Sequence, residues 1–191
     1  MFHKKKAVGC ALALALSGAL LFTACSSAGT VPTEGKATAE PDGKEYTFEY
    51  PESWQVLRSD SMVAVASPDD GGKANITVAG YALSDEYTTL SDYVHNEETG
   101  YIHYLKENFG DRIEVSEDTS PEYTVADHDS VCLTYHIKIG EDDYHFATVL
   151  TVLPTMNAPY LYEILYTAEN ESAYDEHIGV FRDVLSSFTF H

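Results

Sequence analysis

Basic residues are scarce in this chain. Its 191 residues include 11 Lys and Arg against 31 Asp and Glu, which gives a formal net charge of −20 at pH 7. Nucleic-acid binding needs clustered Lys and Arg to neutralise phosphates, so we expect no nucleic-acid partner. Anionic lipid headgroups also repel so acidic a protein within about 8 Å, the Debye length at physiological salt. Attachment to a membrane therefore needs something other than surface charge.

The sequence has a single long hydrophobic run, which lies at the N-terminus. A basic segment, residues 3–6, precedes an uncharged stretch rich in Ala and Leu, residues 7–24. A positive flank, an apolar run and small residues at its end form the pattern of an export signal. Here the small residues stand directly before Cys25, as in bacterial lipoproteins, whose cysteine is lipidated before the chain is cut in front of it. We predict a signal peptide over residues 1–24 and a lipid on Cys25.

The alternative is a retained transmembrane anchor. The apolar stretch has about 18 residues, at the short end for spanning a bilayer, and Ser17, Gly18 and Thr23 dilute it. A lipid is a sufficient anchor, because acyl chains contribute about 0.8 kcal/mol per buried CH₂ and two chains hold a protein stably. The predicted location is the cell membrane, with the protein on the extracytoplasmic side.

Cysteine is scarce too. Cys10 lies in the predicted signal, so cleavage would leave Cys132 as the one unmodified cysteine, and an internal disulfide is excluded. Cys132 lies in a strand-like run, residues 131–135, with no paired base nearby. We expect it to be a small buried side chain and not a nucleophile.

Local catalytic motifs are absent. The sequence has no G-x-S-x-G, no H-E-x-x-H, no P-loop and no G-x-G-x-x-G. Three acidic turns, 69–72, 127–129 and 141–143, could offer oxygen ligands to Ca²⁺, but none has the EF-hand spacing. Asp and Gly are also favoured in ordinary turns. We therefore expect a protein that is not an enzyme and carries no cofactor, with solvated acidic turns as the preferred interpretation.

The chain divides into two parts after the signal. Residues 25–44 contain Val31 as their one large apolar residue, which predicts a flexible tether behind the lipidated cysteine. Residues 45–191 are rich in aromatic residues, without a second linker, and are long enough for one domain with a sizeable core.

Alternation and turn residues predict the elements of this domain. Strands are expected over 46–50, 53–57, 62–67, 75–79, 113–115, 123–126, 130–139, 144–153 and 160–167. Helices are expected over 90–110, where Gly100 allows either a continuous helix or a break, and over 172–185. Short hairpins require antiparallel strands, yet the late strands are apolar on both faces, so helices must cover both. The predicted fold is α+β: an antiparallel sheet between helices, an α/β/α sandwich.

Three short motifs point to a known family. They are Tyr46-x-Phe48-x-Tyr50-Pro51-x-x-Trp54, then Leu90-x-x-Tyr93, and Phe181 with Ser187-Phe188. Together they resemble the landmarks of PsbP-like domains, which include PsbP itself and bacterial DcrB-type lipoproteins. The resemblance covers residues 45–190. It implies an α/β/α sandwich with an accessory or binding role at a membrane, and it carries over no catalytic residue.

The predicted hairpin around residues 140–143 suggests a metal site. A two-residue turn at Gly140-Glu141 places His136 opposite His145, with Asp143 nearby, and two imidazoles and a carboxylate suit Zn²⁺. A turn one residue later would instead set His145 opposite Lys138. Ordinary partly buried histidines are the alternative.

A second candidate site centres on Glu163, a carboxylate inside an apolar strand. Burial of an acid is unfavourable unless it is partnered, so Glu163 is either a hydrogen-bonded structural group, an exposed residue at a strand end, or a group that contacts a ligand. Tyr101 and Tyr104, near the first helix, could belong with it to a recognition surface, since tyrosine is enriched at interfaces. Filling of the core or its rim is the other interpretation.

These observations lead to one functional hypothesis and one rival. The first is a membrane-anchored extracytoplasmic lipoprotein whose PsbP-like domain binds or assists a protein partner without catalysis. The rival is a lipoprotein that binds a solute or a metal, Ca²⁺ or Zn²⁺, and is associated with a transporter.

Overall fold

The computed structural model describes residues 35–40, 45–59, 62–67, 73–84, 87, 89–153 and 159–191. The predicted signal peptide, Cys25 and the acidic turn 69–72 lie outside these residues. Within the described part of the chain, none of the helices combines the length and the apolar character needed to cross a membrane.

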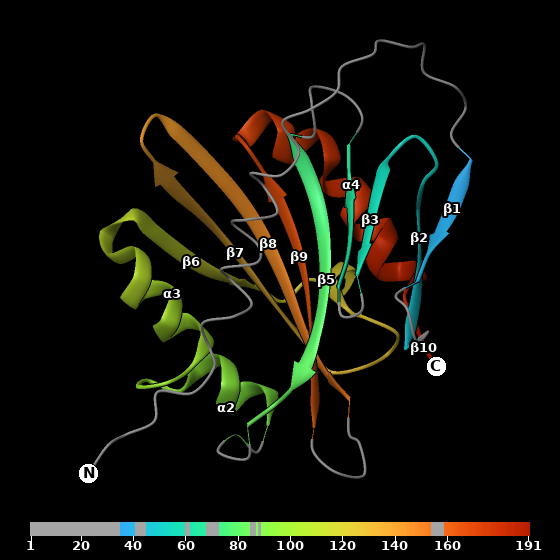
Figure 1. Cartoon of the computed structure of the whole chain (residues 1–191). Coiled ribbons are helices and arrows are strands. Elements are labelled where there is room, and N and C mark those ends of the chain that lie inside the picture. Colours follow the sequence, from blue (N-terminus) through green and yellow to red (C-terminus); the bar gives the residue numbers. More distant parts are fainter. Residues whose placement is uncertain are drawn as a thin grey trace.

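Seven strands form one antiparallel sheet (Figure 1). In spatial order they are β3 (Gln55–Ser59), β4 (Met62–Ala66), β5 (Ala74–Ala82), β9 (Tyr160–Ala168), β8 (Asp142–Leu153), β7 (Ser130–Ile139) and β6 (Ile113–Asp118). The sheet thus consists of two meanders, β3–β5 and β6–β9, which join where β5 pairs with β9. This pairing makes β9 the central strand.

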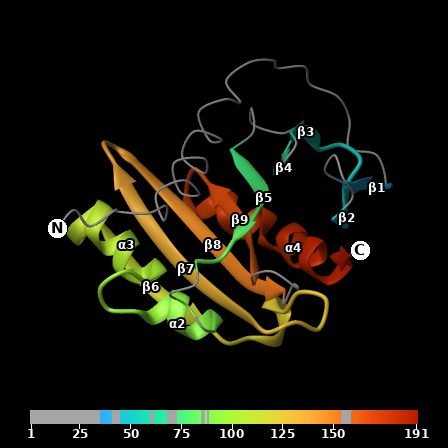
Figure 2. The same ribbon diagram turned by 60° about the horizontal axis from the view of Figure 1, so that its bottom comes forward.

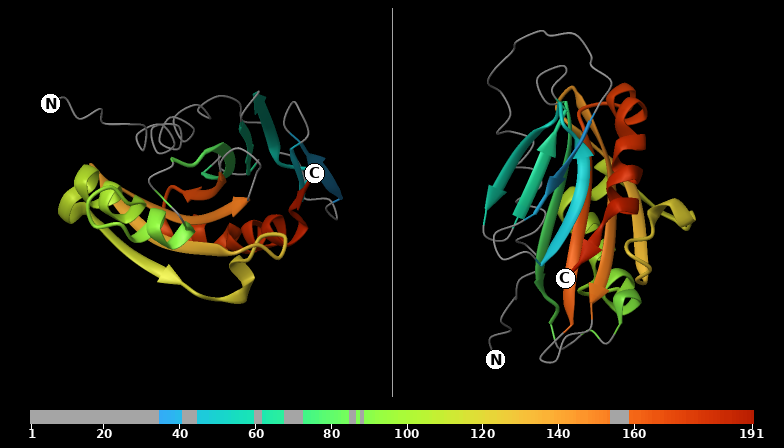
Figure 3. Two further views of the ribbon diagram at one scale, coloured as in Figure 1. Left: turned by 90° about the horizontal axis from the view of Figure 1, so that it is seen from below. Right: turned by 90° about the vertical axis from the view of Figure 1, so that its right-hand side faces the viewer.

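A smaller sheet of three strands lies beside the first. Its middle strand β2 (Tyr46–Pro51) pairs with β1 (Lys36–Ala39) on one side and with β10 (Thr189–Phe190) on the other. The right-hand panel of Figure 3 shows β2 running beside the last helix, α4 (Glu171–Ser187). Strand β1 corrects the sequence-based boundary, because the predicted tether over 25–44 includes residues that pair with the domain. Its sequence, Lys-Ala-Thr-Ala, has no large apolar residue to reveal this.

The first predicted helix is broken in two at Gly100. Helix α2 (Leu90–His95) is capped by the Thr89 hydroxyl, which accepts from the amide of Asp92, and α3 (Tyr101–Phe109) ends at Gly110. A Cβ on Gly100 would lie 2.5 Å from the backbone oxygen of Asn96, so the close approach of the two helices requires glycine. Figure 2 shows α2 and α3 near β6 and β7, whereas α4 lies beside β9.

Helices cover both faces of the large sheet, which confirms the predicted sandwich. On the face of α4, Ala147 and Val149 of β8 belong to a core with Phe181 and Leu185. On the opposite face, β8 directs Phe146 and Leu150 into a second core with residues of α2 and α3. The first and the third of the resemblance motifs meet in the first core, where Phe48 stacks on Phe188 with ring centroids 5.8 Å apart, whereas Leu90 and Tyr93 belong to the second core.

One predicted strand is wrong. Residues 123–126 are expected to pair beside residues 113–115. Instead Tyr123 ends a 3₁₀ turn, η3 (Pro121–Tyr123), and the chain then makes a tight turn in which Ala126 has a positive φ. Tyr123 and Val125 alternate because both are buried in the core on the α4 face, and Tyr123 packs on Phe181. Burial of these two side chains therefore produced the same alternation of apolar and polar residues that a strand would give.

Candidate functional site

The β7–β8 hairpin sets the geometry of the predicted metal cluster. Ile139 pairs with Asp142, which leaves Gly140 and Glu141 as the turn, and Gly140 has a φ of 70°. In this register His136 lies directly opposite His145. The first of the two alternative turns is therefore the one present.

The three side chains of the cluster converge. Nδ1 of His136 lies 3.0 Å from Oδ1 of Asp143, and the rings of His136 and His145 are stacked with centroids 5.6 Å apart. One ligand atom from each of the three residues lies within 4.8 Å of the others. The side chains of His136 and Asp143 are 40% and 35% exposed, so solutes can reach them.

The pKa of Asp143 is lowered by its neighbours. Desolvation acts to raise the pKa of Asp143, but the hydrogen bond with His136 and the charges of His136, His145 and Lys138 together lower it below its ordinary value. Nζ of Lys138 lies 3.9 Å from Oδ2 of Asp143. The carboxylate is therefore available as an anionic ligand at neutral pH.

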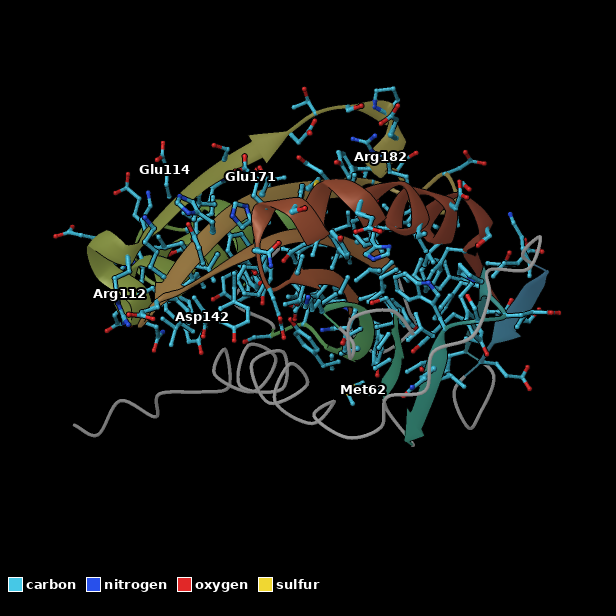
Figure 4. The ribbon with its side chains drawn as sticks, turned by 90° about the horizontal axis from the view of Figure 1, so that it is seen from above. Met62, Arg112, Glu114, Asp142, Glu171 and Arg182 are labelled. Carbon is cyan, nitrogen blue, oxygen red and sulfur yellow. The ribbon has the colours of Figure 1, made fainter. Side chains whose placement is uncertain are left out.

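A further carboxylate stands on the same face of the sheet. Glu114 of β6 lies directly opposite His136, and residues opposite one another across two strands share a face. Sequence reasoning missed Glu114, although its place between Ile113 and Val115 in a predicted strand was a usable signal. Figure 4 shows Glu114 on β6 and Glu171 at the start of α4, and His145 packs near Tyr174 of this helix, with ring centroids 5.9 Å apart.

The second candidate, Glu163, lies on the opposite face and is closed off. Its side chain is 3% exposed and that of Tyr101 is 2% exposed. The Tyr101 hydroxyl donates a 2.6 Å hydrogen bond to Oε1, and the Tyr81 hydroxyl donates a long one, 3.5 Å, to Oε2. Tyr81 is joined in turn to the hydroxyl of Tyr93 at 3.2 Å. The tyrosines of β5, α2 and α3 thus surround one carboxyl group of β9.

Burial governs the protonation of this cluster. It raises the pKa of Glu163 to about 7, although the hydrogen bonds from Tyr101 and Tyr81 act to lower it. Burial and the charge of Glu163 also raise the pKa of Tyr101. At neutral pH the carboxyl group is therefore divided between its protonated and ionised forms, whereas Tyr101 keeps its proton.

The recognition surface expected from Glu163, Tyr101 and Tyr104 is not formed as such. Glu163 and Tyr101 do meet, but inside the domain, and Tyr104 packs partly buried against the same core. Of the three interpretations of Glu163, the hydrogen-bonded structural group fits this geometry. Its partners come from 62 and 82 residues away in the chain, a distance over which sequence pattern gives no guide.

Cys132 matches its predicted role. It is 2% exposed in the core on the α4 face, and burial, with the charge of Asp118 adding to it, raises the pKa of its thiol to about 12. A thiol with so high a pKa is not a nucleophile at neutral pH.

Comparisons with known proteins identify the fold. No family model matches the chain, and no curated protein matches it by sequence. Among solved structures, the domain is similar to the cyanobacterial PsbP (CyanoP) of Synechocystis sp. PCC 6803. That match has a TM-score of 0.54 and 17% identity, and it covers 87% of this chain and 98% of that one.

Two further matches come from distant organisms. LpqN of Mycobacterium tuberculosis, described as involved in cell envelope biogenesis, has a TM-score of 0.57 at 9% identity, over 83% of this chain and 91% of its own. The Ran-binding protein Mog1p of Saccharomyces cerevisiae has a TM-score of 0.51 at 11% identity, over 83% and 96%. Identities this low establish the fold alone, and the motifs around Phe48, Tyr93 and Phe188 agree with it: the described part of the chain has a PsbP-like fold.

Proposed function

We propose that this protein is a lipoprotein anchored outside the cytoplasm, and that its PsbP-like domain binds a protein partner as a non-catalytic accessory subunit. The observation that carries the proposal is the lipoprotein signal ending at Cys25 in front of this particular fold. The same fold occurs in a Ran-binding protein and in a protein of cell envelope biogenesis. The first description names binding of a protein, and neither description names a catalytic activity.

The position of β1 defines how far the domain would stand from the membrane. Ten residues, 26–35, separate Cys25 from Lys36, the first residue of β1. A fully extended chain spans at most about 3.3–3.6 Å per residue, so these residues reach no further than about 36 Å. The start of β1 would therefore stay within about 36 Å of the lipid anchor.

The surface favours a polar contact with a basic partner. Among the described residues, Ile139 is the one exposed large hydrophobic side chain, at 38%. The net charge of −20 attracts a surface of the opposite sign, and such attraction accelerates association and weakens with added salt. We expect the partner to present Lys and Arg to this domain.

The anchor is tested by mass spectrometry of the membrane-extracted protein. We expect Cys25 at the N-terminus, carrying a diacylglyceryl group, and we expect Cys25→Ser to lose this modification. A polypeptide that begins at Met1 without a lipid adduct would refute the anchor.

The partner is tested by cross-linking in intact cells, with the Cys25→Ser variant as the matched control. We expect the anchored protein to give a cross-linked product with a membrane or envelope protein, weakened at high salt and absent from the variant. Equal cross-linking in both, or none above background in either, would contradict the proposal.

The rival function, binding of a solute or metal next to a transporter, has one structural observation in its favour. This is the convergence of His136, Asp143 and His145 at the β7–β8 hairpin.

A further inference from the structure

We propose that His136, Asp143 and His145 bind a divalent transition metal of the Zn²⁺ class, and that Glu114 of β6 supplies a fourth ligand. The site lies at the hairpin end of the large sheet, on the face of α4. It is independent of the anchor and of any protein partner, since all four residues belong to the folded domain.

The donor set selects the class of metal. Two imidazoles with one or two carboxylates match Zn²⁺ and its neighbours in the first transition row, which bind nitrogen and oxygen together. Ca²⁺ prefers six to eight oxygen ligands, and Mg²⁺ an octahedron of oxygens and water. This cluster offers too few oxygens for either ion.

The distances require only small movements. In a tetrahedral zinc site with bonds of about 2.0–2.1 Å, neighbouring ligand atoms lie about 3.3 Å apart. The His136–Asp143 pair already stands at 3.0 Å, and all three ligand atoms are within 4.8 Å of one another. Because the side chains are partly exposed, rotation of a ring or carboxylate can shorten the remaining distances between ligand atoms.

The backbone holds the ligands in place before a metal arrives. Residues directly opposite across antiparallel strands have Cβ atoms about 4.5–5.5 Å apart. The row Glu114–His136–His145 crosses three paired strands, and Asp143 precedes His145 by two residues on the same face. Metal binding would therefore cost the conformational entropy of four side chains and not that of the backbone.

Lys138 is the feature that opposes a metal. Its ammonium group lies 3.9 Å from Asp143 and is on a side chain 66% exposed, so a bound cation would displace it into solvent. Replacement by an uncharged residue should therefore improve metal binding. A purely structural role for the cluster predicts no such improvement.

The test is a titration of the full chain, purified in detergent without a polyhistidine tag, with Zn²⁺ against a chromophoric chelator. We expect one equivalent to bind, and His136→Gln or His145→Gln to weaken binding by at least about tenfold, since even outer-shell partners change metal affinity 10–100-fold. Lys138→Met should bind about two- to fivefold more tightly, the scale of an exposed ion pair. Circular dichroism of each variant verifies that it remains folded.

The matched control is His95, whose Nε2 lies 3.3 Å from Oε2 of Glu117 at similar exposure but belongs to no such three-residue cluster among the described residues. His95→Gln should leave the affinity unchanged. Equal effects of His95→Gln and His145→Gln, or no binding by the unaltered chain, would overturn the site. Titration of Glu114→Gln decides the fourth ligand: unchanged affinity refutes its role, and a loss of tenfold or more supports it.

Discussion

On the α2–α3 face of the large sheet, the carboxyl group of Glu163 is buried and both of its oxygens accept hydrogen bonds from tyrosines. On the α4 face, the carboxylate of Asp143 is partly exposed beside two histidines. Both groups lie on neighbouring strands of one sheet. Burial separates the two roles: a closed acid that is hydrogen-bonded to tyrosines belongs to the packed interior, whereas an accessible acid beside imidazoles can take a ligand.

The largest loss of stability should come from removing a buried side chain from either of the two cores, one on each face of the large sheet. Phe181 of α4 is fully buried against Tyr166 and Tyr123, and Phe181→Ala should lower the free energy of unfolding by about 3–5 kcal/mol. Leu105→Ala in α3, also fully buried, should lower it by about 2–5 kcal/mol. Urea unfolding measures both values. A loss below 1 kcal/mol in either variant would mean that its helix is not packed as described.

The pH dependence of stability separates the two faces. The pKa of Glu163 is raised to about 7 in the folded protein, above its ordinary 4.5. The folded state therefore binds the proton more tightly, so this contribution is fully present below about pH 4.5 and is lost as the pH rises through 7. Relative to Glu163→Gln, the unfolding free energy of the unaltered chain should fall by about 3 kcal/mol between pH 4.5 and 8.

Measurement of both chains side by side cancels the titration of the other acidic groups. Asp143→Asn serves as the counterpart on the α4 face. The pKa of Asp143 is lowered, so its small contribution should change in the opposite sense and be lost as the pH falls. A flat difference between the unaltered chain and Glu163→Gln would show that Glu163 is not buried as an acid.

The loss of stability on removing each tyrosine hydroxyl near Glu163 should be larger for the hydroxyl that lies closer to its carboxyl group. Tyr101→Phe removes the 2.6 Å hydrogen bond and should destabilise the domain by about 1–3 kcal/mol at pH 8, where the carboxylate is ionised, and by less at pH 5. Tyr81→Phe removes the 3.5 Å bond to the same group and should have a smaller effect. The reverse order, found by thermal or urea unfolding, would contradict the assigned network.

The smallest effect on stability should come from the metal cluster itself. His136→Gln breaks a partly exposed pair with Asp143, and such pairs contribute about 0–1 kcal/mol. In the absence of metal, the unfolding free energy should therefore change by less than about 1 kcal/mol, while added Zn²⁺ should stabilise the unaltered chain and not the variant. A large loss without metal would make the cluster a structural element like Glu163.

Local pattern was sufficient for much of this fold. The turn residues 140–143 located the β7–β8 hairpin and left two registers, of which the one that joins His136 to His145 is present. The two-sided apolar pattern of residues 144–153 correctly required helices on both faces. Gly100 marked the break between α2 and α3. These features depend on neighbours in sequence or on a single strand, where spacing carries the information.

The misses share a physical cause. Tyr123 and Val125 alternate like a strand but are buried in the core on the α4 face, and β1 pairs with β2 although it has only Ala37 and Ala39, and no large apolar side chain, to signal it. The tyrosines that surround Glu163 come from three other elements. Each of these arrangements is decided by contacts between distant parts of the chain.

Strand β1 has a mechanical consequence for an anchored protein. It has four residues, and within the described part of the chain it pairs with β2 alone. If Cys25 is held by a lipid, a load on the domain pulls first on this short ladder and on Ala39, which β1 contributes to the core on the α4 face. Peeling β1 away would extend the available chain from residues 26–35 to residues 26–45, about doubling its maximum length to roughly 70 Å. The pairing of β1 with β2 would thus limit how far the domain can move from the membrane. Under tension this pairing would break before the large sheet and its helices unfold.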